Sequence, residues 1–131
     1  MTFPGNLPAA ARRHLQAAEE LEPGHRRDVA GYLYGIAAEC AIKQMITRLA
    51  LPREVNKKEL LFAHFPELRI LLRDALQGRR GAALWTVIMH DRFLHNWHVR
   101  MRYADAREIL DAWVDDWRRQ AKDVVNAMEA S

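Results

Sequence analysis

Residues 105–128, DAREILDAWVDDWRRQAKDVVNAM, decide the fold. Their apolar members recur at steps of three and four, the spacing that places side chains on one face of an α-helix. Asp105 followed by Glu108 fits a capping box, in which both side chains bond backbone N–H groups at a helix start. We therefore predict a long final helix, capped by Asp105. Its buried seam is expected to hold Leu110, Trp113, Val114, Trp117, Ala121, Val124, Val125 and Met128.

Caps, breakers and the same apolar spacing predict four helices upstream. Their approximate bounds are Asn6 to Leu21, Arg26 to Ala50, Pro66 to Leu76 and Ala82 to Asn96. The polar segment 53–58 is expected to form a loop. The prediction is an all-α fold, a four- to five-helix up-and-down bundle, with one domain over residues 1–131.

The length, the apolar runs and the single cysteine limit which classes of protein the chain can belong to. The 131 residues suffice for a core without disulfides or metal, and we expect neither a metal nor a cofactor. No apolar run approaches the roughly 18 residues of a membrane span, and the first residues lack a secretory signal, so we expect a cytoplasmic protein. The single Cys40 lies among alanines and is expected to be a buried structural thiol.

Two glycines lie inside the second predicted helix, where each costs about 1 kcal/mol relative to alanine. Gly31 and Gly35 therefore predict the close approach of another backbone. Together with the aromatic-rich last helix, they suggest more apolar surface than one small bundle needs. We accordingly expect a homodimer.

In residues 92–103 the sequence pattern changes from helical spacing to alternation of polar and apolar residues. Arg92, His95 and Asn96 share one face of the predicted helix, at spacings i, i+3 and i+4. From His98 the residues alternate, which predicts an extended segment with cationic or titratable side chains on one side. We expect Arg92, His98, Arg100 and Arg102 to line one concave positive surface with Asn96 at its edge, and the intervening Val99, Met101 and Tyr103 to be buried.

The charge distribution agrees with a cationic surface. Sixteen of the twenty basic residues are arginine, and the stretch from Arg79 to Arg107 holds six arginines against Asp91 and Asp105, a local charge of +4. The planar guanidinium suits phosphate or carboxylate. The alternative is that arginine reflects a GC-rich genome and covers solvated helix faces.

Three blocks, in this order, resemble the HEPN family of small helical domains. The first is GYLYGIAAECAIK at 31–43, with a glutamate four residues before a lysine; the second is HFPELRILL at 64–72; the third is WHVRMRYAD at 97–105. The third departs from the family at Ala104, where proline is common. The blocks span about 75 residues. The resemblance implies a four- or five-helix bundle, commonly dimeric, that works on or beside RNA or nucleotides.

The resemblance also implies roles for individual residues. Many members are metal-independent ribonucleases of toxin–antitoxin and defence systems, with an arginine and a histidine four to six residues apart. Arg92 and His98 have five residues between them, and His95 is a second candidate acid. Other members are binding modules or partners of a nucleotidyltransferase or an antitoxin. In that case the binding residues are expected to be Asn96, Trp97, Arg100, Arg102 and Tyr103.

Glu39 and its neighbours leave two interpretations open. An ionised carboxylate among alanines is costly unless it is paired. Glu39 either forms an i,i+4 surface pair with Lys43 or holds Arg92 or Arg102 from inside the bundle, and the second is favoured. His64 is expected to cap or pack at a helix start, and Trp97 either joins the core or stacks a base.

Three functions follow from these observations. The first is a dimeric helical module that binds RNA, a nucleotide or a partner protein through the arginine-rich patch. The second is a metal-independent endoribonuclease built on Arg92 and His98. The third is a structural dimerisation domain whose arginines pair with acids of the last helix.

Overall fold

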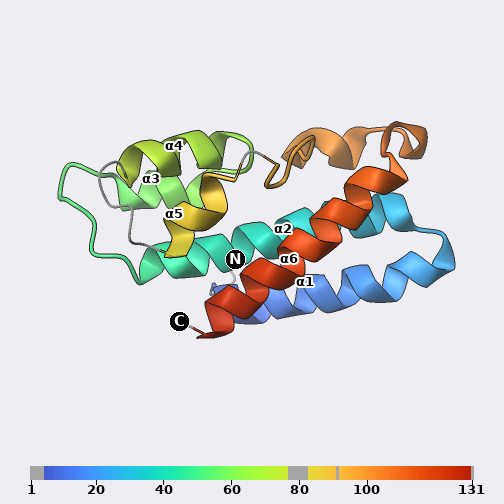
Figure 1. The fold of residues 1–131 in the computed structure, drawn as a ribbon, viewed down its shortest axis with the longest axis horizontal. Helices are drawn as coiled ribbons and strands as arrows, with labels where there is room; N and C mark the ends of the chain where they lie inside the picture. The colour runs from blue at the N-terminus through green and yellow to red at the C-terminus, as the bar shows by residue number, and fades with distance from the viewer. Residues whose placement is uncertain (1–4, 77–82, 91, 131) are drawn as a thin grey trace.

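The computed structural model describes residues 5–76, 83–90 and 92–130, and within these ranges it holds helices and connecting turns but no strand (Figure 1). The prediction of an all-α fold is confirmed. The α-helices are α1 (Leu7–Leu21), α2 (Arg27–Thr47), α3 (Lys57–Phe62), α4 (Glu67–Ala75), α5 (Ala83–Ile88) and α6 (Asp111–Ala130). Three short 3-10 helices are η1 (Glu22–Gly24), η2 (Val99–Tyr103) and η3 (Ala106–Glu108).

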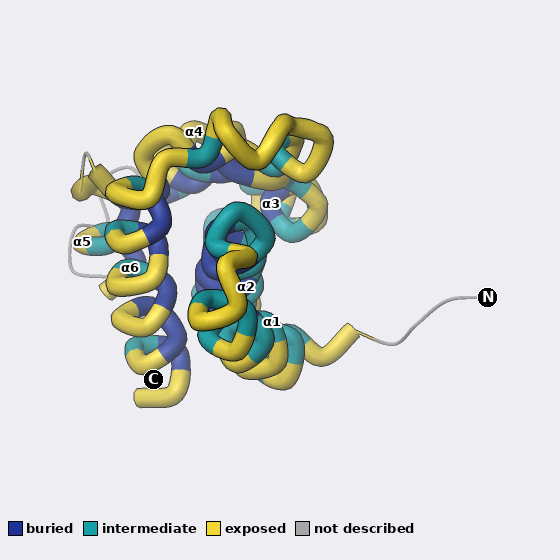
Figure 2. The backbone as a smooth tube through the Cα atoms, turned by 90° about the vertical axis from the view of Figure 1, so that its right-hand side faces the viewer, coloured by how far each residue is buried: buried dark blue, intermediate teal, exposed yellow. Residues whose placement is uncertain are grey.

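The long helix α2 lies at the centre of the molecule. It packs against α1 and α6, while α3, α4 and α5 gather near its C-terminal half (Figure 1). The buried side of α6 faces α2, and the opposite side is exposed (Figure 2). In Figure 1, α2 and α6 run in the same direction, and α1 runs in the opposite direction.

Small residues explain why α2 can be buried on several sides. Alanines bring neighbouring backbones close, and larger side chains fill the remaining space. The small side chains of α2 therefore allow it to pack closely at the centre of the molecule. Its buried apolar residues are Ala30, Tyr34, Ala37, Ala38, Ala41, Ile42, Met45 and Ile46.

The first helix begins at its predicted cap, and α4 begins directly after Pro66, close to its predicted bounds. The Asn6 side chain accepts a hydrogen bond from the backbone N–H of Ala9 at 3.1 Å, as an N-cap should. In the segment 53–58, the predicted loop is interrupted because Asn56 caps α3 by accepting from the N–H of Glu59 at 3.1 Å. The sequence analysis missed this one-and-a-half-turn helix, which is too short to show an apolar period.

The last helix begins later than predicted. Asp105 caps η3 by accepting from the N–H of Arg107 at 2.9 Å, and α6 starts only at Asp111. Leu110 therefore precedes the helix and is half-exposed, and Trp113 is partly buried. The rest of the seam is confirmed: Val114, Trp117, Ala121, Val124, Val125 and Met128 are buried.

The two glycines of α2 make room for indole rings. A Cβ atom on Gly31 would lie 3.0 Å from the side chains of Trp117 and Val114. A Cβ atom on Gly35 would overlap the indole of Trp97. The predicted close approach is real, but the approaching groups are tryptophans of the same chain and not another backbone.

None of the helices in the described ranges combines the length and the apolar character that crossing a membrane requires.

Candidate functional site

The segment 92–97 turns sharply and is fixed to the core by buried side chains. The fourth predicted helix ends at Ile88, eight residues before the expected Asn96. Phe93, Leu94 and Trp97 are at most 5% exposed. The segment is therefore anchored although it is not a regular helix.

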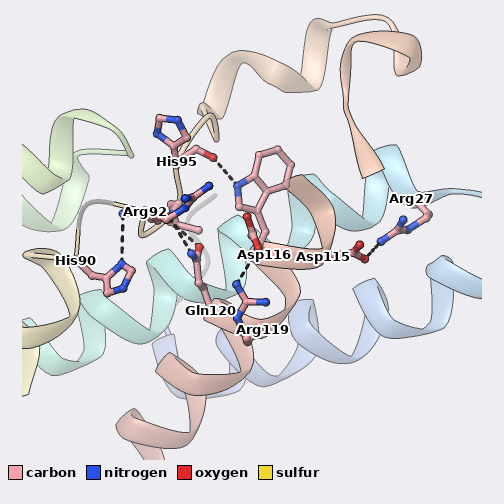
Figure 3. Close-up of polar contacts among 10 residues, drawn as sticks. Arg27, His90, Arg92, His95, Asp115, Asp116, Arg119 and Gln120 are labelled. Carbon is pink, nitrogen blue, oxygen red and sulfur yellow. Dashed lines mark hydrogen bonds and ion pairs between the residues drawn. The ribbon is translucent and has the colours of Figure 1, made fainter. Parts of the chain in front are cut away.

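Side chains of α6 replace the hydrogen bonds that a longer α5 would have made. Gln120 accepts from the backbone N–H of Leu94 at 2.9 Å and donates to the carbonyl of Arg92 at 2.8 Å (Figure 3). The indole N–H of Trp117 donates to the carbonyl of His95 at 2.9 Å. These bonds satisfy three backbone groups of the turn outside any regular helix.

Two residues of the turn have left-handed backbones, which no α-helix contains. Leu94 has φ 49° and Asn96 has φ 68°. Asparagine tolerates this region, but it is unfavourable for leucine and persists only when the surroundings impose it. Burial of Leu94 and the Gln120 bonds supply that constraint here.

The predicted extended segment after His98 is a 3-10 helix. Nδ1 of His98 accepts from the backbone N–H of Arg100 at 3.0 Å and so caps η2. A 3-10 helix has three residues per turn, so alternate residues do not share a face. Val99 and Met101 are half-buried, but Tyr103 is 77% exposed, contrary to the expectation that it is buried.

The cationic side chains nevertheless lie at the surface. Asn96 is exposed in the same stretch. No hydrogen bond or ion pair joins these cationic side chains to a carboxylate of the described residues, and the Arg102 guanidinium lies 5.2 Å from the centre of the Tyr103 ring. We call the following exposed residues the cationic segment: Arg92, His95, His98, Arg100 and Arg102.

Five arginines outside the cationic segment pair with acids in the described residues. Arg27 contacts three acids, Glu22, Asp111 and Asp115. Further pairs are Arg12 with Glu129, Arg26 with Asp28, Arg107 with Asp105 and Arg119 with Asp116.

Of the two interpretations of Trp97, the structure agrees with the core role and not with base stacking. Its ring is 2% exposed and stacks on Tyr32 with the ring centroids 5.9 Å apart. Its indole N–H donates to the carbonyl of Gly31 at 3.3 Å. Tyr103 offers the exposed aromatic ring beside the arginines instead.

The predicted catalytic pair is not assembled by any direct contact within the described residues. In neutral imidazole one nitrogen donates and the other accepts. Because Nδ1 of His98 accepts from Arg100, the proton lies on Nε2 in this geometry. The outward nitrogen is then a donor, and His98 could serve as a base only by giving up its cap.

Glu39 holds neither Arg92 nor Arg102, which corrects the favoured expectation. Its Oε1 lies 3.0 Å from Nζ of Lys43 and 2.5 Å from Nδ1 of His64, and its Oε2 accepts from the N–H of Phe65 at 3.3 Å. The pair with Lys43 is real but buried, since Glu39 is 3% and Lys43 8% exposed. Glu39 thus ties α2 to the start of α4.

His64 is the polar partner that the sequence analysis did not assign to Glu39. The only signal in the sequence was a histidine just before a helix, in the second block of the resemblance. Its ring is half-exposed, and Glu39 fixes its orientation. The histidine is therefore placed by a buried carboxylate 25 residues earlier.

Cys40 is expected to react slowly. Burial, and then the neighbouring Glu39 carboxylate, raise the pKa of its thiol, which lowers the fraction of reactive thiolate. We expect alkylation of the native protein at mildly alkaline pH to be at least about ten-fold slower than in denaturant. Mass spectrometry of timed samples measures this ratio, and equal rates would contradict a structural role for Cys40.

Comparisons with protein-family models, with curated proteins and with solved structures give no match to this chain. Membership of the HEPN family stays a prediction.

Proposed function

We propose that the chain is a HEPN-like helical module that binds single-stranded RNA through the cationic segment. The observation that carries the proposal is a set of exposed guanidinium groups, on Arg92, Arg100 and Arg102, without carboxylate partners in the described part of the chain. Phosphate oxygens match the planar fork of arginine. Gln120 and Trp117 fix the backbone at Arg92 and His95, so little order has to be gained there on binding.

RNA is favoured over an acidic protein by the ring beside the arginines. Proteins that bind single strands combine a cationic track with aromatic rings on which bases stack. Tyr103 is 77% exposed, and the Arg102 guanidinium lies against it. An acidic peptide would use the charges but would gain little from this ring.

The proposal predicts that Arg100→Ala/Arg102→Ala weakens RNA binding by about ten-fold or more, because each arginine lost removes a phosphate contact. Fluorescence anisotropy with a labelled, unstructured oligonucleotide measures the affinity at fixed salt. The matched control is Arg13→Ala/Arg53→Ala, which removes the same charge from two exposed arginines outside the segment. Equal losses in both variants would reduce the effect to net charge and contradict the proposal.

Incubation of the protein with RNA and a chelator distinguishes the binding module from the alternative endoribonuclease. A binding module leaves RNA intact during incubation with a chelator, in agreement with an Nε2-protonated His98. Cleavage that disappears in His98→Ala while binding remains would replace the proposal by the endoribonuclease built on Arg92 and His98.

Exposed apolar side chains on α3 and α4 support the proposed homodimer. Gly31 and Gly35 receive tryptophans of their own chain and no longer support it. Support comes from Phe62 and Ile70, which are 72% and 60% exposed on α3 and α4. Light scattering distinguishes a dimer from a 15.2 kDa particle.

A further inference from the structure

We infer that the cleft between α5 and α6 binds a guanine base of the RNA. This inference rests on the proposed function and assigns a base-reading site next to the cationic segment. The cleft has a volume of about 270 Å³, close to the lower end for ligand pockets. A single planar ring system suits that size.

The walls of the cleft are apolar and its rim is polar. Val87, Phe93 and Val124 supply aliphatic and aromatic surface on which a flat base can lie. Asp123 and His90 bring a carboxylate and an imidazole to the same space. An apolar interior with a few polar groups is the usual composition of a selective small-ligand site.

Two of the other polar side chains that line the cleft are already engaged. Gln120 uses its amide on the turn, and Arg119 pairs with Asp116 at 2.8 Å (Figure 3). Asp123 has no hydrogen bond or ion pair to any described residue. Its two oxygens are therefore available to accept hydrogen bonds from a ligand.

His90 contributes a donor of defined position. Its Nδ1 accepts from the backbone N–H of Arg92 at 3.3 Å (Figure 3), which leaves the proton of the neutral ring on Nε2. That Nε2–H has no partner in residues 5–76, 83–90 and 92–130. His90 and Asp123 thus offer one donor and one bidentate acceptor, beside the hydroxyl of Thr86, which also lines the cleft.

Guanine is the base that matches this set. Its N1–H and N2–H groups can both donate to the two oxygens of one carboxylate, and its O6 and N7 accept from a donor such as Nε2–H of His90. Adenine sets a ring acceptor beside its amino group, so one oxygen of Asp123 would face a lone pair. Uracil has a single N–H between two carbonyl groups and meets the same conflict.

The cleft and the cationic segment are joined through Arg92. His90 and Gln120 line the cleft and both bond the backbone of Arg92 (Figure 3). A nucleotide whose base enters the cleft would therefore bring its phosphate toward the start of the cationic segment. Phosphate contacts then set affinity, and the cleft reads the base.

The test compares an oligouridylate with the same oligomer carrying one central guanine or one central adenine. For the wild type we expect the guanine oligomer to bind about ten-fold more tightly than the other two. Asp123→Asn keeps the shape but replaces one acceptor by a donor, so it should remove the guanine preference, measured as the ratio of the affinities for the guanine oligomer and for oligouridylate. Asp74→Asn, the same change at an exposed position of α4, should keep the preference.

The outcomes separate the two proposals. Equal affinity of the wild type for all three oligomers would overturn the guanine site while leaving RNA binding in place. A guanine preference that survives in Asp123→Asn would also overturn it. If none of the oligomers binds, the proposed function fails, and the guanine site fails with it.

Discussion

Gly35→Ala is expected to lower the free energy of unfolding by about 3 kcal/mol or more, the upper range for overpacking a core. The added Cβ would overlap the indole of Trp97. That ring cannot move away freely, because it is buried, stacks on Tyr32 and bonds the carbonyl of Gly31. Urea denaturation followed by circular dichroism measures the loss.

Alanine at two other glycines should cost less stability than alanine at Gly35. A Cβ on Gly24 meets nothing within 4 Å, so Gly24→Ala should change stability by less than about 1 kcal/mol. Gly31→Ala brings 3.0 Å contacts and should lie between the two. A Gly35→Ala protein as stable as the wild type would mean that Trp97 does not lie against α2, and the anchor of the cationic segment would be lost.

Glu39→Ala is expected to cost about 3–5 kcal/mol, the range for breaking a buried ion pair. The change leaves the Lys43 ammonium buried without its carboxylate and removes the acceptor for the N–H of Phe65. It also releases His64 at the start of α4. Denaturation curves of single and double variants measure these losses.

The double variant Glu39→Met/Lys43→Met separates burial of charge from packing. It removes both charges at similar volume, and such replacements are often neutral or stabilising. We expect it to regain most of the stability lost in Glu39→Ala. A Glu39→Ala protein within about 1 kcal/mol of the wild type would show that the pair is open to solvent.

Local patterns predicted the parts of the fold that local forces determine. The Asn6 cap, the long apolar α2 and the seam of α6 follow from spacing and side-chain type, and the structure agrees with them. The Asp105 cap was recognised, but its helix was not, because Asp105 begins a short 3-10 turn before α6. A cap residue does not reveal how long the helix after it will be.

The candidate site was predictable in part. Arginine content and spacing indicated the exposed cations, but the turn that carries them is set by Gln120 and Trp117, which lie 26 and 22 residues further along the chain. The same limit applies to Glu39, whose partner His64 lies 25 residues away. The alternatives in which Trp97 stacks a base and Glu39 holds an arginine are not supported, because the partners of both residues come from distant elements.

The salt dependence of RNA affinity tests the central claim most directly. For single strands, the slope of log affinity against log salt is about −0.7 for each phosphate contact. We predict a linear decrease for the wild type, a slope shallower by about 1.4 in Arg100→Ala/Arg102→Ala, and an unchanged slope in Arg13→Ala/Arg53→Ala. A wild-type slope near zero, or the same slope in both double variants, would contradict phosphate binding by the cationic segment.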